Sequence, residues 1–420
     1  MQILLKSAQI IDPTSPFHGK KQDILINSGI IAKIDDHVDA QEAHVVNCDG
    51  AYMSLGWFDM NVHFEDPGNE HKEDLYSGIA AAAAGGFTDV GVLPNTSPTI
   101  DTKNQVEYIL SKSSHHPVNL HPFCAITKNC NGAELTEMID LKEAGAKAFT
   151  DGINPIQNTD ILLKTLQYLQ KFDGLLINRP EDKQLNMFGT MHEGIVSTTL
   201  GLKGMPSIAE VVMIQRDLKI LEYTGGRIHF SNISTEESVK LIEQAKQKGL
   251  KVSCDVAAHS LIFGDSLMGE YDANYKVNPP FRLEQDRLAL IEGLKNGVID
   301  VIVSSHQPQD SESKELEFDL ADFGAIGLQT VLPIIVELSS SVDLEYLIAK
   351  VTSAPRRLLG LENGSIKEGE QAVLTIFDTS KKWVFNSDTN FSKSKNSPLY
   401  GKELIGKVLG IVNGEMSYFL

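Results

Sequence analysis

The sequence predicts an α/β protein built on a TIM (β/α)8 barrel, with a small β-sandwich domain made from both ends of the chain. Three observations lead to this prediction. Short apolar runs alternate with helical stretches through residues 53–360, and this alternation is typical of parallel sheets. It repeats eight times, the number that closes a parallel sheet into a barrel. The two ends of the chain carry short β-rich segments instead, and chain termini often lie close together.

The N-terminal part of the sandwich, residues 1–52, contains two predicted strands, MQILLKSAQIID and DILINSGIIAKI. The break at residues 27–29 supplies a hairpin turn. The C-terminal part, residues 361–420, contains QAVLTIFD, KKWVF and KVLGIVNGEMSYF, with a second hairpin turn at residues 412–414. We therefore expect one composite β domain assembled from both segments.

The barrel segment supplies its strands as eight apolar runs. They are, in order, SLGWFDMNVHF, TDVGVLPN, VNLHPFCAIT, AKAFTDG, GLLINRPED, RIHFSNIST, KVSCDVAAH and VIDVIVSSHQ. Stretches such as EDLYSGIAAAAAGG and TEESVKLIEQAKQKG have helical spacing between them. Chemistry in such barrels lies at the carboxyl ends of the strands. The polar residues at those ends are Asn61, His63, Asn95, Asp151, Arg179, Asn232, His259, Ser305 and His306. The acidic segment 306–319 is predicted to be a mobile loop over the barrel mouth.

Composition limits the classes of function. Of the 420 residues, 42% are apolar and 22% are charged, and 56 acids against 37 Lys and Arg give a net charge of -19. Nucleic-acid binding needs a basic surface, so this class is disfavoured. The four cysteines form no C-x-x-C pair, which favours reduced thiols in a cytosol. The first residues contain no long apolar run, and no membrane span fits the chain. We expect a cytoplasmic protein.

The first strand end carries Asn61 and His63, two positions apart. Side chains at i and i+2 of a strand face the same side, so a His-x-His pair here would hold a metal. This chain has Asn-x-His instead. A single strand-end histidine is more often a hydrogen-bonding residue than a ligand. The tripeptide alone does not decide between the two roles.

The surrounding sequence resembles a known family. SLGWFDMNVHFEDPG followed by KEDLYSGIAAAAAGGFTDVGVLPNTSP is similar to the opening of a dihydroorotase of the cyclic amidohydrolase superfamily, of the type found in bacterial multifunctional complexes. Further matches are AGAKAFTDG, EDKQL, IHFSNISTEESV, KVNPPFR, SHQP, GAIGLQT, TSAPRRLLGL and GSIKEGEQAVLTIFD. The resemblance covers nearly the whole chain. It implies an amidohydrolase-type barrel that opens or closes the dihydroorotate ring, with one or two zinc ions activating water and an aspartate as the acid–base group.

The chain departs from the family where the chemistry should be. Zinc prefers imidazole, thiolate and carboxylate donors. An Asn amide is a poor substitute, glycine has no side-chain donor, and arginine carries no free lone pair. A serine cannot replace the catalytic aspartate unless a base activates it. The family's metal and catalytic positions are occupied by Asn61, His63, Gly152, Arg179, Asn232 and Ser305. We therefore predict no tight zinc site and no cofactor.

Substrate binding is predicted to be only partly lost. Glu65 stands where the family's arginine would hold the substrate carboxylate, and this reversed charge should repel dihydroorotate. The family's other substrate-contacting positions are matched by Asn95, Asn278 and His306, which could equally cap turns or satisfy loops. We further expect Arg179 to fill the vacated metal space and to pair with Asp151 or Glu65, because buried carboxylates need a partner.

Three hypotheses follow. In the first, the chain is a non-catalytic dihydroorotase homologue that supports the assembly of aspartate carbamoyltransferase, as the resemblance implies for such chains. In the second, it is an active dihydroorotase or a related cyclic-amide hydrolase whose zinc is held by His63, Asp151, Glu181 and His306. In the third, it is a metal-free binder of pyrimidine intermediates that uses Asn95, Asn278 and His306. In each case we expect a homo-oligomer.

Overall fold

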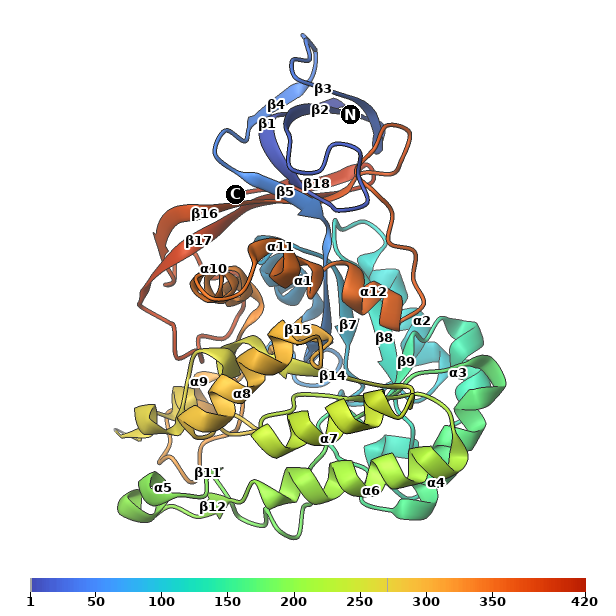
Figure 1. The fold of residues 1–420 in the computed structure, drawn as a ribbon, viewed down its shortest axis with the longest axis vertical. Helices are drawn as coiled ribbons and strands as arrows, with labels where there is room; N and C mark the ends of the chain where they lie inside the picture. Colours follow the sequence, from blue (N-terminus) through green and yellow to red (C-terminus); the bar gives the residue numbers. More distant parts are fainter. Residues whose placement is uncertain (1, 270) are drawn as a thin grey trace.

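The computed structural model describes residues 2–269 and 271–420, so Met1 of the first predicted strand lies outside it. Figure 1 shows two parts joined end to end: a barrel with surrounding helices and, above it, a sheet built from both ends of the chain. The predicted fold class is confirmed. Among the described residues, no helix is long and apolar enough to cross a membrane.

Seven of the barrel strands lie within the predicted runs, and the second strand begins one residue before its run, at Phe87. The barrel strands are β6 (Trp57–Val62), β7 (Phe87–Val92), β8 (Asn119–Cys124), β9 (Ala148–Phe149), β10 (Leu176–Asn178), β13 (Ile228–Phe230), β14 (Val252–Ala257) and β15 (Val301–Val303). They pair in the order β15-β14-β13-β10-β9-β8-β7-β6. A parallel bridge between Val62 and His306 joins the two ends of this sheet. The barrel is therefore nearly closed, and its strand ends meet around one mouth.

Helices surround the barrel. They are α1 (Leu75–Ala84), α2 (Lys103–Ser113), α3 (Met138–Ala144), α4 (Thr159–Leu169), α6 (Ile208–Thr224), α7 (Glu236–Gln247), α8 (Glu284–Lys295), α10 (Val331–Leu338), α11 (Leu344–Ala349) and α12 (Ser353–Leu358). Local sequence explains where they begin. Asp74 caps α1 through the backbone N–H of Ser77, and Thr235 caps α7 through that of Ser238. Apolar side chains inside the barrel, among them Phe58, Phe123 and Val303, fill its centre, so the barrel is a packed core rather than a pore.

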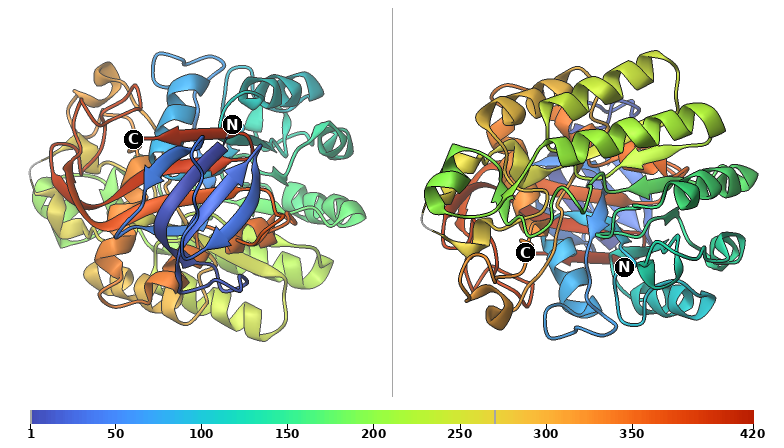
Figure 2. Two further views of the ribbon diagram at one scale, coloured as in Figure 1. Left: turned by 90° about the horizontal axis from the view of Figure 1, so that it is seen from above. Right: turned by 90° about the horizontal axis from the view of Figure 1, so that it is seen from below.

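The second sheet contains strands from both termini. They are β1 (Gln2–Ile11), β2 (Lys21–Asn27), β3 (Ile30–Asp35), β4 (His44–Asn47), β5 (Tyr52–Leu55), β16 (Val373–Val384), β17 (Glu403–Asn413) and β18 (Met416–Phe419). β5 joins the two ends, because it pairs with β1 on one side and β16 on the other. Both predicted hairpins are present, between β2 and β3 and between β17 and β18. The predicted strands QAVLTIFD and KKWVF form the single strand β16. The sheet curls around its own apolar core (Figure 2).

Two loops reach the carboxyl end of the barrel from different parts of the chain. The acidic segment 306–319 contains α9 (Ser311–Lys314), and it is anchored rather than loose. The buried Nζ of Lys314 donates to the carbonyl oxygens of Ala273 and Asp322, each at 2.8 Å. The loop between β16 and β17 also arrives there, where Asn396 Nδ2 donates to the carbonyl oxygen of Gln307 at 3.0 Å. The terminal domain thus helps to hold the loops around the mouth.

Candidate functional site

The strand ends converge on one small cavity at the mouth of the barrel. It measures about 10 Å³, which is room for about one water molecule. Its lining is Asn61, His63, Leu93, Thr150, Gly152, Ile153, Ile177, Arg179, Ser231, Asn232, Asn278, Ser305 and Gln307. The six positions that the sequence assigns to the family's metal and catalytic groups are all in this set, and Asn278 is the one predicted substrate-contacting residue that joins them. Asn95, His306 and Glu65 do not line the cavity.

Amide and hydroxyl groups bond to one another across the cavity. Asn61 Nδ2 donates to Ser231 Oγ at 2.8 Å, and Asn232 Nδ2 donates to Ser305 Oγ at 3.0 Å. Asn232 and Ser305 both have positive φ, 54° and 49°, a region that is uncommon for non-glycine residues and is found at functional sites. These pairs use up much of the hydrogen-bonding capacity of the lining. Neither pair supplies a strong metal donor.

Arg179 enters the cavity from the end of β10, as predicted, but its partner is not the predicted one. Its Nε lies 3.6 Å from Oε2 of Glu181, and its side chain is buried. The prediction of a pair with Asp151 or Glu65 is wrong. The Asp151 carboxylate instead accepts from the backbone N–H groups of Ile126 and Thr127, both at 2.9 Å. Arg179 therefore pairs with Glu181, two residues further along the chain, rather than with a carboxylate from another loop.

Glu181 also binds Asn278, whose Nδ2 donates to Glu181 Oε2 at 3.0 Å. This links the loop after β10 to the loop after β14 at the cavity wall. The Nη2 atom of Arg179 is buried without a partner among the described residues, and so is Oδ1 of Asn232.

Asn95 and Gly152 are in direct contact. Asn95 Nδ2 donates to the carbonyl oxygen of Asp151 at 3.0 Å, and the N–H of Ile153 donates to Asn95 Oδ1 at 3.0 Å. A Cβ atom added to Gly152, which has φ of 61°, would lie 1.7 Å from Asn95 Oδ1. Asn95 therefore holds the loop after β9 and leaves no room for a side chain at position 152.

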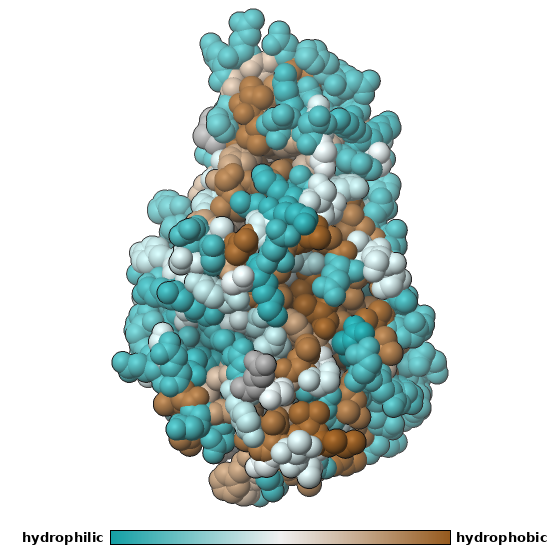
Figure 3. All heavy atoms as spheres, turned by 90° about the vertical axis from the view of Figure 1, so that its left-hand side faces the viewer, coloured by the Kyte–Doolittle hydropathy of each residue, from teal (hydrophilic) through white to brown (hydrophobic). Residues whose placement is uncertain are grey.

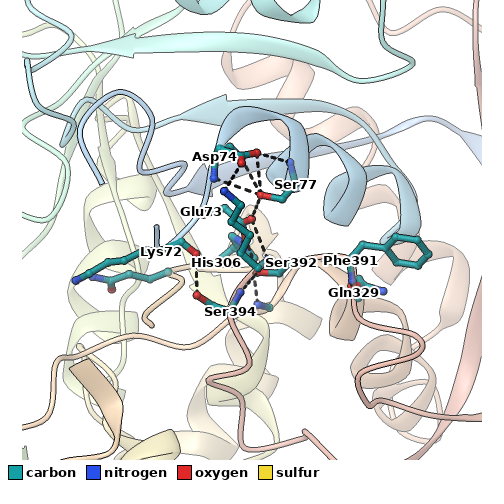
Figure 4. A network of polar contacts seen from close by, with 12 residues as sticks. Lys72, Glu73, Asp74, Ser77, His306, Gln329, Phe391, Ser392 and Ser394 are labelled. Atoms are coloured by element: carbon teal, nitrogen blue, oxygen red, sulfur yellow. Dashed lines mark hydrogen bonds and ion pairs between the residues drawn. The ribbon is translucent and has the colours of Figure 1, made fainter. Parts of the chain in front are cut away.

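His306 faces away from the cavity. Its Nδ1 accepts from the N–H of Gly327 at 3.2 Å, and its Nε2 lies 3.4 Å from Oε2 of Glu73. Figure 4 shows that Glu73 also accepts from Ser77 and from Ser392 of the loop between β16 and β17. His306 thus belongs to a buried network that ties the terminal domain to the barrel.

Glu65 is also occupied by its own loop. Its Oε2 accepts from Asn69 Nδ2 at 3.1 Å, and burial raises the pKa of its carboxyl group. The side chain is therefore used locally rather than at the cavity wall, where the sequence suggested that it would repel a substrate carboxylate.

His63 is the one imidazole, thiolate or carboxylate side chain among the described residues that line the cavity. Burial, together with the nearby charges of Arg179 and His306, lowers the pKa of His63 to about 3, so its ring is neutral at physiological pH. Zinc requires three or four such donors. The described residues contain no cluster of three His, Cys, Asp or Glu side chains that could hold a metal. The cavity residues therefore do not fit the zinc that the family resemblance implies.

Sequence reasoning missed three polar residues of the cavity: Thr150, Ser231 and Gln307. Ser231 is the partner of Asn61, and it directly precedes a residue that was singled out. Because Ser231 directly follows a strand, its position in the sequence could have identified it as a residue of the barrel mouth. Its role as a hydrogen-bond acceptor from a strand on the other side of the barrel depended on the barrel's closure.

The architecture is shared with solved amidohydrolases. The L-hydantoinase (dihydropyrimidinase) from Arthrobacter aurescens matches with a TM-score of 0.86 at 22% identity, over 100% of this chain and 97% of that one. The dihydropyrimidinase from Brevibacillus agri NCHU1002 matches with a TM-score of 0.83 at 19% identity, over 99% and 95%. At these identities the likeness establishes the fold. The fold is therefore a TIM barrel with a terminal β domain.

Sequence comparison defines the family. A family model described as dihydro-orotase-like matches residues 51–238. The dihydroorotase of Aquifex aeolicus (strain VF5) is 40% identical over 422 residues, covering 100% of this chain and 99% of that protein. The dihydroorotase of Acetivibrio thermocellus is 38% identical over 419 residues, covering 99% and 98%. The chain belongs to the dihydroorotase family, and the resemblance identified from its motifs is confirmed.

Proposed function

We propose that this chain is a non-catalytic member of the dihydroorotase family that works in the cytoplasm in pyrimidine biosynthesis by supporting the assembly of aspartate carbamoyltransferase. The observation that carries the proposal is the content of the barrel-mouth cavity. At the positions where the family resemblance implies zinc ligands and a catalytic aspartate, this chain has one neutral imidazole, two amides, a glycine, a hydroxyl and a guanidinium. A buried guanidinium repels a divalent cation. Amide groups are poor substitutes for the imidazole and carboxylate donors that zinc prefers.

Two further features of the cavity support this proposal. The contact between Asn95 and Gly152 leaves no room for a carboxylate at the position where the family would bridge two metals. The cavity of about 10 Å³ is also far smaller than the several hundred Å³ typical of pockets for small molecules. This size counts equally against the metal-free binder of pyrimidine intermediates.

An active hydrolase is the second candidate, because relatives named dihydroorotase are about 40% identical to the whole chain. It would need His63, Asp151, Glu181 and His306 to share a metal. Of these four, Asp151 bonds to backbone N–H groups, Glu181 pairs with Arg179, and His306 faces Glu73. A large rearrangement of three loops would have to precede metal binding.

The deciding experiment measures metal content and turnover together. Protein purified without chelators is analysed for zinc by mass spectrometry and assayed for dihydroorotate hydrolysis. We expect much less than one zinc per chain and no hydrolysis above background. A ratio near one with turnover, both lost in the His63→Asn variant, would establish the active enzyme instead.

The assembly role needs its own measurement. The chain is mixed with aspartate carbamoyltransferase from the same organism, and the mass of the mixture is followed by light scattering. We expect a complex heavier than either component and transferase activity that survives dilution better in its presence. Two separate peaks with unchanged masses at all ratios would remove the proposed partner.

A further inference from the structure

The guanidinium group of Arg179 makes no hydrogen bond within the described part of the chain. Only 8% of this residue is exposed, and its Nη2 atom is buried without a partner there. The nearest carboxylate oxygen, Oε2 of Glu181, lies 3.6 Å from Nε, which is too far for a hydrogen bond. Burying a charge without hydrogen bonds is costly, so this group needs an acceptor that the chain does not supply.

The two other buried arginines of the described residues do find acceptors. Arg282 donates through Nη1 to the carbonyl oxygen of Met205 at 2.7 Å. Arg356 donates to a carbonyl oxygen and to the carboxylate of Asp89. Charged groups at the surface are hydrated instead, and hydrophilic side chains cover the upper part of the face drawn in Figure 3. Arg179 has neither a protein acceptor nor a position at the surface.

The cavity beside Arg179 carries a positive charge that nothing in its lining balances. No acidic side chain of the described residues lines this space, and the His63 ring in the lining is neutral. Glu181 is not part of the lining, and its Oε2 already accepts from Nδ2 of Asn278 at 3.0 Å. The electrostatics are therefore the reverse of those of a metal site, where negative ligands surround a cation.

Three hydroxyl groups of the lining also have a proton to donate. Thr150, Ser231 and Ser305 each accept one hydrogen bond through the hydroxyl oxygen, and none donates to an acceptor within the described residues. A hydroxyl proton rotates to suit its partner. These residues and Arg179 follow four different strands, β9, β13, β15 and β10, and they all line the same small space. Charge-assisted hydrogen bonds from such donors are what holds an anion.

Asn232 can add a further donor to this set. Its Oδ1 is buried without a partner among the described residues, while its Nδ2 donates to Ser305 Oγ at 3.0 Å. A half-turn of the amide lets Oδ1 accept from the Ser305 hydroxyl and directs Nδ2 into the cavity, because the two ends of an amide have nearly the same shape. An anion in the cavity favours this orientation, and it satisfies both atoms.

The size of the cavity selects the anion. Its volume of about 10 Å³ has room for about one water molecule, so phosphate, sulfate and the carboxylates of metabolites do not fit, whereas a monatomic anion does. We propose that the position of the family's metal site binds one chloride ion in this chain, held by Arg179 and by the hydroxyl groups of Thr150, Ser231 and Ser305. The ion neutralises the buried guanidinium and links the ends of four barrel strands. This inference rests on the zinc-free state in the proposed function, since a cation and an anion cannot share so small a space.

The first test locates the ion in crystals of the wild-type chain. Bromide is the probe, because it has the charge of chloride and its position is given by anomalous scattering. Crystals grown in sodium bromide should show one anomalous peak in the cavity, within hydrogen-bonding distance of Nη2 of Arg179, with the Asn232 amide turned as described. Density in the cavity without an anomalous signal identifies a water molecule and overturns the proposal.

The second test measures binding in solution by thermal unfolding in sodium chloride and in sodium gluconate of equal ionic strength. The wild type should melt about 1–2 °C higher in about 200 mM chloride, as expected for a ligand of the folded state with a Kd of some tens of millimolar. Arg179→Met should lose this chloride-specific rise. Arg357→Met, the matched control, removes an exposed arginine and should keep it. Circular dichroism checks that both variants are folded.

Equal melting temperatures of the wild type in the two salts overturn the proposal even when bromide is seen in the crystal, because the ion is then adventitious. The same rise in Arg179→Met as in Arg357→Met also overturns it. If Arg179→Met does not fold, Ser305→Ala takes its place, and it should reduce the rise because it removes one donor. The zinc content of the same samples separates the two proposals. One zinc per chain refutes both, whereas zinc-free protein that binds no halide refutes only the chloride site.

Discussion

Two buried arginines lie at opposite ends of the barrel in different surroundings. Arg356 of α12 lies at the amino end, where its Nη1 donates to the carbonyl oxygen of Gly56 at 2.5 Å and its Nη2 to Asp89 Oδ2 at 2.5 Å. The other Asp89 oxygen lies 2.8 Å from His121 Nε2 and accepts from Asn119 at 3.0 Å. These hydrogen bonds and the charge of Arg356 hold the pKa of Asp89 well below its usual range, although burial alone would raise it.

Arg179 at the carboxyl end has a looser setting. Its nearest carboxylate oxygen, on Glu181, is 3.6 Å from Nε, and its Nη2 has no partner among the described residues. The amino end of a TIM barrel serves stability, and the carboxyl end carries the site. The comparison teaches that a buried charge is fully paired where it builds the fold. At the mouth of the barrel, the charge of Arg179 is left partly unpaired.

The strongest test of this comparison removes the well-paired arginine. Arg356→Met should destabilise the chain by about 3–5 kcal/mol, because it leaves the Asp89 carboxylate buried without its cation. Urea denaturation measures the free energy of unfolding. Arg357→Met is the control, since the adjacent Arg357 is exposed. A loss below about 1 kcal/mol would mean that the pairing at the amino end is not essential.

The pH dependence of stability sharpens the picture of the cavity. The pKa of His63 is about 3 in the folded chain and about 6.5 when unfolded, so unfolding takes up a proton as the pH falls below 6.5. Because of His63, the free energy of unfolding should therefore fall by roughly 2 kcal/mol as the pH is lowered from 7 to 4.5. His63→Asn should lose less stability over this interval, as measured by urea denaturation at both pH values. If His63→Asn loses as much stability between the two pH values as the exposed control His44→Asn does, the His63 ring lies in solvent.

The network in Figure 4 predicts a smaller effect. Ser392→Ala removes a hydrogen bond from the loop between β16 and β17 to the buried Glu73 carboxylate, and should cost about 1–2 kcal/mol. Ser387→Ala lies in the same loop with an exposed side chain and should be neutral. Thermal unfolding of both variants measures the difference. Equal melting temperatures for the two would show that the loop is held by its other contacts.

The smallest effect is expected at the loosely paired arginine. Arg179→Met should change the free energy of unfolding by less than about 1 kcal/mol, because it removes one long ion pair and an unpaired donor. Urea denaturation of this variant and of Arg356→Met under the same conditions compares the two ends of the barrel directly. A loss of about 3 kcal/mol or more would erase the distinction and assign Arg179 a structural role equal to that of Arg356.

Much of the fold could be predicted because local sequence and pattern determine it. Each barrel strand matches one of the apolar runs to within one residue, and the turns at residues 27–29 and 412–414 form both terminal hairpins. The cavity could also be located in outline, since the ends of parallel strands must meet at one face. The direction of individual side chains could not be predicted. His306 and Asn95 follow strands as expected, yet each satisfies a neighbouring loop.

The sequence by itself determined which groups stand at the family's metal and catalytic positions: two amides, a glycine, a serine and an arginine, with one histidine. Their chemistry follows from residue type and needs no coordinates. Only the tertiary structure decided that Glu181 is the partner of Arg179, and that Asn95 fills the space above Gly152. Those outcomes depend on distances between loops that lie far apart in the chain. The physical reason is that buried polar groups bind whichever partner the closed barrel brings within reach.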